Sequence, residues 1–199
     1  MGATKNLTFY QGKTFSLALR WETGPINYKA ITAITQTAPA RVTAPSHGIP
    51  DGWRVAIVSV KGMTQINAEN APPRPKDHHK ATVVDSNTIE FNDINAAEFK
   101  AYQSGGYLQF NTPVSMVGMT ARMSVKDKAG GTQLLSLTTE NDRIVIDDAA
   151  KTITLNLSAA DTALITWKRG VYDLELVSAD GEVTGLLSGE VTVTQEVTT

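Results

Sequence analysis

The sequence contains no cysteine, few aromatic residues and little net charge. Without cysteine the chain cannot be a small domain held together by disulfides, and it has neither thiolate metal ligands nor a cysteine nucleophile. A formal net charge of −2 gives no electrostatic reason to expect a nucleic-acid partner. No apolar run approaches the ~18 residues of a membrane span, and the N-terminal residues lack the apolar centre of a signal peptide. We therefore expect a protein made in the cytoplasm, with no membrane and no nucleic-acid partner.

The stretch Gly170 to Val193 has the clearest strand pattern in the chain. Three large side chains alternate with mostly polar ones, which predicts a strand with one buried face (Tyr172, Leu174 and Leu176). The following Asp180-Gly181 pair favours the tight turn of a hairpin. Two glycines, at 185 and 189, suggest a bulge or a bend, so we interpret the return run from Glu182 to Val193 as two short strand pieces.

The segments before residue 28 and after residue 113 share this pattern. Leu7 to Tyr10 predicts an edge strand, and the next run alternates four large side chains with smaller or polar ones (Phe15, Leu17, Leu19 and Trp21). Four later runs also predict strands: 120–125, 134–138, 144–146 and 152–157. Ser158 with Asp161 three residues later predicts a capped helical turn. Roughly seven to nine short strands at this spacing indicate an antiparallel β-sandwich.

Residues 29 to 113 differ in composition, holding most of the prolines and all three histidines. Their predicted strands are short: 41–43, 53–60, 81–84, 88–91 and 106–110. Asn92 to Tyr102 has a loose helical spacing, and the prolines from 72 to 75 predict an exposed loop. We expect an all-β protein in which residues 1–28 and 114–199 form a discontinuous β-sandwich and residues 29–113 form an inserted small β-rich domain. The two ends of the insert should then lie close together.

Two sets of motifs resemble known families. The outer segments carry FYQGKTFSLALRW at residues 9–21, TARM at 120–123 and GVYDLELV at 170–177. These resemble small structural proteins of tailed phages and prophages and, more distantly, the N-terminal immunoglobulin-like domain of siphophage upper baseplate proteins. The resemblance implies an immunoglobulin-like antiparallel sandwich in a virion protein.

The inner segment carries SHGIPDGW at residues 46–53, VSVKGMTQIN at 58–67, VDSNTIE at 84–90 and YQSGG at 102–106. It resembles the small β-barrel module, named after the first catalytic-cysteine half-domain, of ubiquitin-activating enzymes, which phage tail proteins also carry. The resemblance implies a barrel-like insert. No ubiquitin chemistry follows from it, because the chain has no cysteine.

Three groups of residues have the composition of a chemical site, and for each a structural turn is the better interpretation. His78 and His79 lack a third metal ligand at a diagnostic spacing. His47 lies with Ser46 and Asp51 in a Gly-Pro turn, which does not arrange a nucleophile, a base and an orienting group. The third group lacks the glycine and terminal glutamate of an EF-hand (Asp142, Asp147 and Asp148). We therefore expect no catalytic residue, no cofactor and no bound metal.

Surface residues are the remaining candidates. Arg122, Lys126 and Lys128 form a modest basic cluster, which in most proteins is a solvated face. Trp53 and Trp167 are open candidates for stacking on a sugar, whereas the strand alternation places Trp21 in the core. Apolar residues near two predicted strand ends are candidates for contact with neighbouring subunits. The candidate interface residues are Val114, Val117, Met119, Leu186, Leu187, Trp53 and Trp167.

The resemblance and the missing catalytic geometry together give a functional expectation. We expect a non-enzymatic structural protein of a tailed-phage virion, in the tail, baseplate or neck, that acts in assembly or as an adaptor. Its partners would be other phage structural proteins and further copies of itself. A head decoration or cement protein is the first alternative, and a receptor-binding or carbohydrate-binding module is the second.

Overall fold

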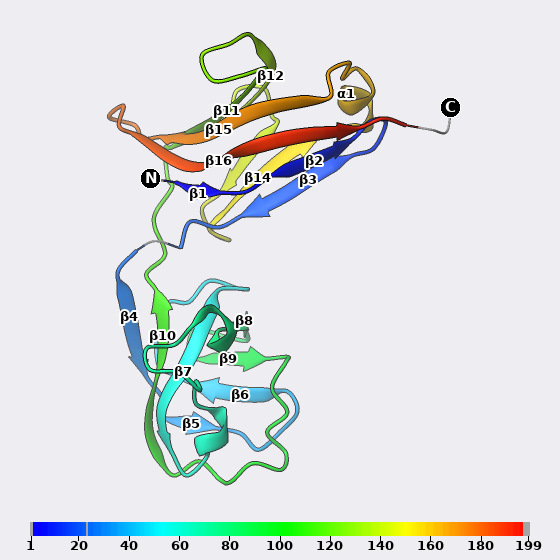
Figure 1. Cartoon of the computed structure of the whole chain (residues 1–199). Coiled ribbons are helices and arrows are strands. Elements are labelled where there is room, and N and C mark those ends of the chain that lie inside the picture. The colour runs from blue at the N-terminus through cyan, green and yellow to red at the C-terminus, as the bar shows by residue number, and fades with distance from the viewer. Residues whose placement is uncertain (1, 23, 197–199) are drawn as a thin grey trace. The chain divides into compact units, whose positions relative to one another are not determined.

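The computed structural model describes residues 2–22 and 24–196 and is nearly all β (Figure 1). Its strands divide into two compact units. Unit 1 consists of residues 1–21 and 115–199, and unit 2 consists of residues 22–114. The first boundary lies earlier than the sequence suggested, at residue 21 instead of 28. The reason is that β4 (Ile26–Ala30) pairs along its length with β10 (Ser104–Asn111) of unit 2.

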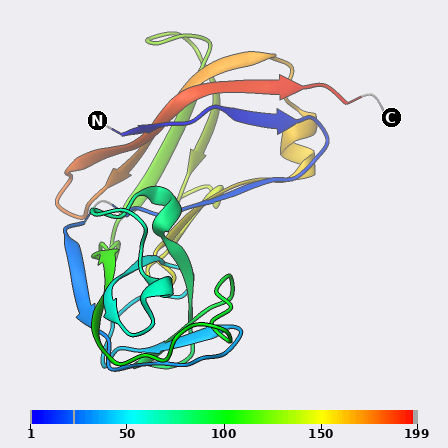
Figure 2. The same ribbon diagram turned by 60° about the horizontal axis from the view of Figure 1, so that its bottom comes forward.

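Unit 1 is a β-sandwich of two sheets. The order of the larger sheet is β1 (Ala3–Thr4), β16 (Val183–Thr194), β15 (Arg169–Val177), β11 (Thr120–Lys126) and β12 (Gln133–Thr138), and β2 (Leu7–Tyr10) also pairs with β16. The smaller sheet has the order β13 (Ile144–Asp147), β14 (Thr152–Leu157) and β3 (Phe15–Leu19). All these pairs are antiparallel except those of β1 and β2, which run parallel to β16 (Figure 2).

The alternation in the sequence determines which face of each strand is buried. Tyr172, Leu174 and Leu176 of β15 are buried as predicted, together with Met123 of β11. The four large residues of the Phe15 run pack against this core but stay half-buried, because β3 is an edge strand of the smaller sheet. These contacts join residues from both outer segments into one apolar core, as the discontinuous sandwich requires.

β16 is one continuous strand, so the prediction of two short pieces is wrong. The glycine-containing region holds a bulge, which is one of the two features that the glycines suggested. Leu174 pairs with Leu187 and Glu175 with Gly185, which leaves Leu186 as the extra residue. At Gly189 a Cβ would lie 2.3 Å from the carbonyl oxygen of Lys5, so glycine allows the N-terminal segment to approach β16 closely.

Unit 2 is a single sheet of seven strands, all antiparallel. Its order is β4, β10, β7 (Arg54–Lys61), β8 (His79–Val83), β9 (Thr88–Phe91), β6 (Ala40–Thr43) and β5 (Ala33–Ile34). The five strands predicted for this region are present with small shifts at their ends. The sequence analysis missed β4 and β5, together with two 3-10 turns at Thr64–Ile66 and Pro75–Asp77. The largest side chains buried within the unit include Trp53, Phe91 and Phe110.

The helix suggested for residues 92–102 is absent, and the segment forms turns. Its backbone groups bond to a neighbouring segment instead of along a helix. The carbonyl of Ile94 accepts from the N–H of Ala40, and the N–H of Ala96 donates to the carbonyl of Thr37, both at 3.0 Å. Of the residues at helical spacing, Ile94 is buried and Phe99 and Tyr102 pack against the core, whereas Ala97 is exposed, so the spacing did not mark a helical face.

The only α-helix in the described part of the chain is short. α1 (Ala159–Ala163) begins at Ser158 as predicted, with the reciprocal bonds of a capping box between Ser158 and Asp161. None of the helices in residues 2–22 and 24–196 has the length and apolarity of a membrane span.

The two ends of unit 2 are hydrogen-bonded neighbours. In the ladder between β4 and β10, Ile26 lies opposite Asn111, and just beyond it the N–H of Thr112 donates to the carbonyl of Pro25 at 2.9 Å. The chain therefore enters and leaves unit 2 on adjacent strands.

Replacing residues 22–114 with a short Gly-Ser linker should leave a folded unit 1. Its core draws on its own residues, and the cost of loop closure changes by only about 0.6 kcal/mol for each doubling of loop length. Urea denaturation followed by tryptophan fluorescence and by circular dichroism should give one coincident, cooperative transition. A shortened chain without cooperative unfolding would show that unit 1 needs the residues that were removed.

Candidate functional site

His47 is a structural histidine. It is buried, its Nδ1 accepts from the backbone N–H of Ile49 at 3.0 Å, and its Nε2 lies 2.9 Å from the carbonyl oxygen of Asp85. Because Nδ1 is an acceptor, the ring proton is on Nε2 and is donated to Asp85. Both nitrogens are thus occupied in holding two loops together. Of the other residues of the apparent triad, Asp51 accepts from the N–H of Val83, and the backbone N–H of Ser46 donates to Asn87.

His78 and His79 also contact different partners. His78 Nδ1 lies 2.9 Å from the carbonyl oxygen of Arg74, whereas His79 Nδ1 lies 2.7 Å from Asp93. Over the described residues no group of three or more His, Asp or Glu side chains is placed to hold a metal ion. The loop interpretation holds for His78 but is wrong for His79, which is the first residue of β8 and pairs with Val55 of β7.

A depression of about 360 Å³ beside His79 collects several charged groups of unit 2. Its most buried charged member, Asp77, accepts from the N–H of Arg74 at 2.7 Å and from the side chain of Asn70. The backbone bond from Arg74 is the largest cause that holds the pKa of Asp77 below its ordinary value, and the Asn70 bond acts in the same direction. The carboxylate is therefore ionised and satisfied by the loop itself, which describes a structural aspartate.

Asp147 and Asp148 stabilise the turn between β13 and β14, which agrees with the interpretation of these residues as a structural turn. Asp147 accepts from the N–H of Ala150 at 2.9 Å. Asp148 accepts from Lys151 at 2.7 Å and from the backbone N–H of Met116 at 2.6 Å. The Lys151 bond is the largest cause that lowers the pKa of Asp148, followed by the Met116 bond. Asp148 thereby attaches the segment before β11 to the smaller sheet.

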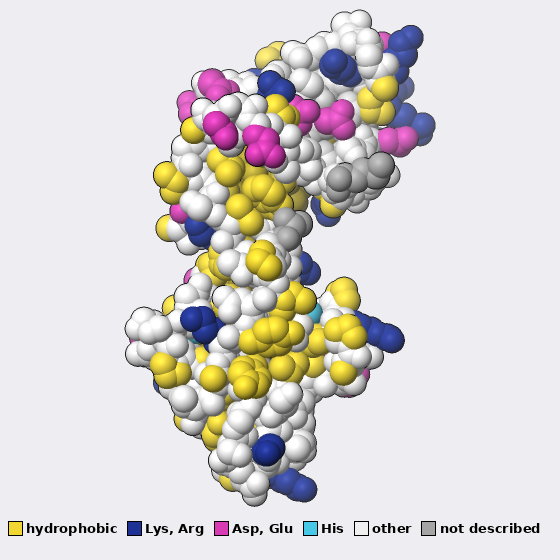
Figure 3. Space-filling view, turned by 90° about the vertical axis from the view of Figure 1, so that its left-hand side faces the viewer, with side chains coloured by type: hydrophobic (Ala, Val, Ile, Leu, Met, Phe, Trp, Pro, Cys, Tyr) yellow, Lys and Arg dark blue, Asp and Glu magenta, His cyan; other side chains and the backbone are white. Residues whose placement is uncertain are grey.

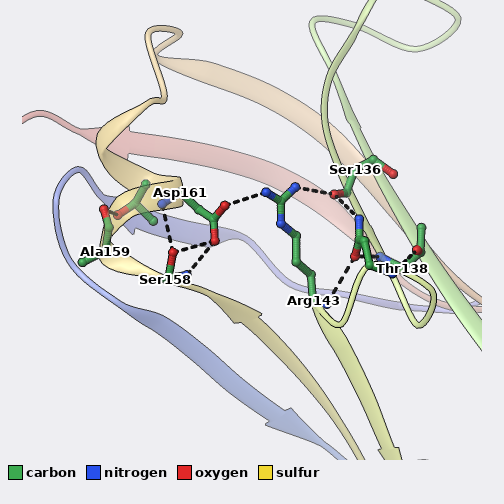
Figure 4. Close-up of polar contacts among 8 residues, drawn as sticks. Ser136, Thr138, Arg143, Ser158, Ala159 and Asp161 are labelled. Carbon is green, nitrogen blue, oxygen red and sulfur yellow. Dashed lines mark hydrogen bonds and ion pairs between the residues drawn. The ribbon is translucent and has the colours of Figure 1, made fainter.

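Arg143 connects three elements of unit 1 (Figure 4). One guanidinium nitrogen donates to the carbonyl of Ser136 in β12, at 3.1 Å, and another forms an ion pair with Asp161 of α1. Hydrogen bonds from the Ser158 side chain and backbone are the largest causes that lower the pKa of Asp161, and Arg143 adds to them. Because Arg143 directly precedes β13, this polar cluster links the two sheets of the sandwich at one end of the core.

The candidate interface residues lie in different environments. Trp53 is fully buried, and its indole N–H donates to the carbonyl of Asn111 at 2.8 Å, so it is a core residue and not a surface anchor. Leu187 is buried too, and the edge-strand argument for it is wrong, because β16 is flanked by β15 on one side and by β1 and β2 on the other. The half-buried residues are Val114, Met119, Leu186 and Trp167.

Val117 is the exposed member of the set, at 75%. It lies next to Gly118, where an added Cβ would be 3.9 Å from Ala179 in the β15–β16 turn. Trp167 packs edge-on against Phe9 at a ring distance of 6.5 Å and belongs partly to the core. Among these candidates, Val117 beside the β15–β16 turn is the clearest surface contact point.

An exposed apolar surface that the sequence analysis missed lies on unit 2. We call it the β4 surface, and it consists of Ile26 and Tyr28 of β4 with Tyr107 of β10, which are 54%, 53% and 45% exposed. The two tyrosine rings meet edge-on at 6.3 Å. Figure 3 shows hydrophobic side chains gathered on the side of unit 2 where β4 lies. The signal was present as the alternation in INYKA, but Pro25 and the polar residues around it favoured a turn.

The basic cluster lies on the polar outer face of the larger sheet of unit 1. Arg122 pairs with Glu175 at 2.7 Å across β11 and β15. A shallow depression of about 570 Å³ on this face is lined by both signs of charge, with Lys126, Asp173 and Glu190 joining that pair. This balance matches a solvated face more closely than an anion-binding patch.

No protein-family model matches the chain, and no curated protein matches it.

Substituting His47→Ala should destabilise unit 2 by about 2 kcal/mol, because the change leaves the buried N–H of Ile49 without its acceptor and also removes the part-buried bond to the carbonyl of Asp85. His78→Ala is the matched control and should cost less than about 1 kcal/mol, since that ring makes one bond at a more exposed position. Urea denaturation of both variants measures the difference. Equal losses would contradict the structural role assigned to His47.

Asp161→Asn should lower the free energy of unfolding by about 1 kcal/mol at neutral pH. The folded state depresses the pKa of Asp161, so the stabilisation is present above the ordinary carboxyl pKa and is lost as pH falls through the lower, folded value. The difference in the free energy of unfolding between the natural protein and the variant should therefore become smaller below pH ~4. Urea denaturation at a series of pH values tests this. If the difference in the free energy of unfolding does not change with pH, the ionised carboxylate of Asp161 does not stabilise the fold.

Proposed function

We propose that this protein is a non-enzymatic structural component of a tailed-phage virion, in the tail, baseplate or neck, where it acts as an assembly or adaptor protein. The motifs of residues 9–21, 120–123 and 170–177 are what point to phage proteins. The resemblance of residues 46–106 to a module carried by phage tail proteins points in the same direction.

The use of the polar residues supports a binding role over a catalytic one. His47, Asp77, Asp148 and Asp161 all have their hydrogen-bonding groups directed into turns and caps of the fold. Several large apolar side chains, by contrast, face solvent, among them Val117 and the residues of the β4 surface. Exposed apolar side chains gathered on one face are typical of contact with another protein. This contrast is the observation that carries the proposal.

The tryptophans do not support the sugar-binding alternative. A sugar-stacking platform needs aromatic faces open to solvent. Trp53 is fully buried, and Trp21 and Trp167 are half-buried against the core of unit 1. A head decoration protein shares the proposed chemistry and differs in where its copies sit in the particle.

The proposal is tested on particles released from the host that carries this sequence. Virions purified on a density gradient should contain the chain at a fixed ratio to the major tail protein, and a reconstruction should place its copies in a closed ring on the tail or neck. Copies spread over the head lattice would favour the decoration alternative. Recovery of the chain only in the particle-free fraction would rule out a virion component.

A further inference from the structure

β4 is an edge strand with one free row of backbone groups. In its ladder with β10, the N–H of Ile31 donates to Gly106 and the N–H of Thr112 donates to Pro25. In an antiparallel pair these bonds recur at every second residue, so the odd-numbered residues of β4 face β10. The N–H and C=O groups of Ile26, Tyr28 and Ala30 therefore point away from β10, toward the open edge.

This edge lacks the protective features that most exposed strands carry. Such features are an inward-pointing or flanking charge, a proline within the strand, or a bulge. β4 contains no proline, and its register with β10 is continuous. Its one charged residue is Lys29, whose ammonium donates to the carbonyl of Ser46 at 2.9 Å. Lys29 is thus engaged with a neighbouring loop and does not guard the edge.

The side chains of the same three residues form one row on one face. Ile26 and Tyr28 are about half exposed, Ala30 is exposed, and Tyr107 extends the row onto β10. A strand added at this edge would pair its backbone with these residues and cover their apolar side chains at the same time. This combination is the one used in recognition by strand addition.

We propose that β4 pairs antiparallel with β4 of a second copy of this chain, about a two-fold axis at Tyr28. In this register Tyr28 lies opposite Tyr28 of the other copy, and Ile26 lies opposite Ala30. Ile26, Tyr28 and Ala30 are the residues whose backbone groups face the open edge. The Tyr28–Tyr28 pair and both Ile26–Ala30 pairs can therefore exchange backbone hydrogen bonds. The proposal does not depend on the assignment to a virion.

The chemistry of β4 favours a second copy over an unrelated strand. The pairing is isologous, so each side chain must be compatible with the one that symmetry places opposite to it. On the apolar face the pairs are tyrosine with tyrosine and isoleucine with alanine, and aromatic pairs across strands are stabilising. On the other face Lys29 lies opposite Asn27, so no like charges meet. The five-residue strand is therefore complementary to itself in both backbone and side chains.

A contact limited to this edge is small, so we expect a dimer that dissociates on dilution. Stable interfaces bury roughly 1,200–2,000 Å² in total, and smaller ones are weak and transient. The dissociation constant of the dimer should thus lie between about 10 μM and 1 mM. Pairing should become strong only where further contacts outside β4 hold two copies close together.

Amide hydrogen exchange on the natural protein at increasing concentration gives the first test. The amides of Asn27 and Lys29 should be protected at every concentration, because they bond to β10 within one chain. Those of Ile26, Tyr28 and Ala30 should become protected, by at least about tenfold, only as the dimer forms. Exchange at these three residues that is independent of concentration would overturn the proposal.

A charge swap at the symmetry axis gives the second test. Tyr28→Lys and Tyr28→Glu each place two like charges opposite one another and should weaken self-association by about tenfold or more. Mixing the two variants places opposite charges at the axis and should restore association as a mixed dimer. Sedimentation equilibrium measures each case, and circular dichroism verifies that each variant is folded.

The matched controls are Val145→Lys and Val145→Glu on β13, an edge strand of unit 1 where Val145 is 49% exposed. These variants should dimerise like the natural protein. A natural protein that stays monomeric up to about 1 mM would overturn the proposal. So would a Lys–Glu mixture that fails to associate, or a Val145 variant that loses the dimer, because each places the contact elsewhere.

Discussion

The antiparallel ladder between β4 and β10 is the constraint on which the organisation of the chain depends. It brings the two ends of residues 22–114 side by side, so a seven-stranded sheet can interrupt the sandwich without separating the segments that build the sandwich core. The same ladder determines which residues of β4 use their backbone groups internally. One set of hydrogen bonds therefore closes unit 2 and also leaves a row of donors and acceptors at its edge.

Where alternation was strong, the sequence was a sound guide to the fold. β15, β11 and β14 follow directly from their period-two patterns, and the Ser158 cap followed from local chemistry alone. Predictions from the sequence were wrong where pairing between distant segments overrides the local pattern of apolar and polar residues. Residues 92–102 have helical spacing but bond to a neighbouring segment, and Trp53, which looked like a surface anchor, fills the core of unit 2. The β4 surface was missed because the partner of β4 lies about 80 residues away along the chain.

Polar residues hold the loops of both units in place. Arg143 spans from β12 to α1, Asp148 fixes the segment before β11, and His47 joins two loops of unit 2 through both ring nitrogens. Each of these residue types is also common in chemical sites, because catalysis and loop fixation draw on the same side chains. Burial and the identity of the hydrogen-bond partners separate the two uses, and neither can be read from spacing alone.

The interrupted arrangement of unit 1 also has a consequence for how the protein is made. Translation delivers β2 and β3 early, yet their partners β16 and β14 emerge only after the whole of residues 22–114 has left the ribosome. Unit 2 draws all its strands from one uninterrupted stretch, so it can fold while the sandwich is still incomplete. The nascent chain must therefore keep Leu7, Phe9 and Phe15 unpaired until β14 and β16 have been made, and a folded unit 2 would shorten the effective distance that these residues cross to reach their partners.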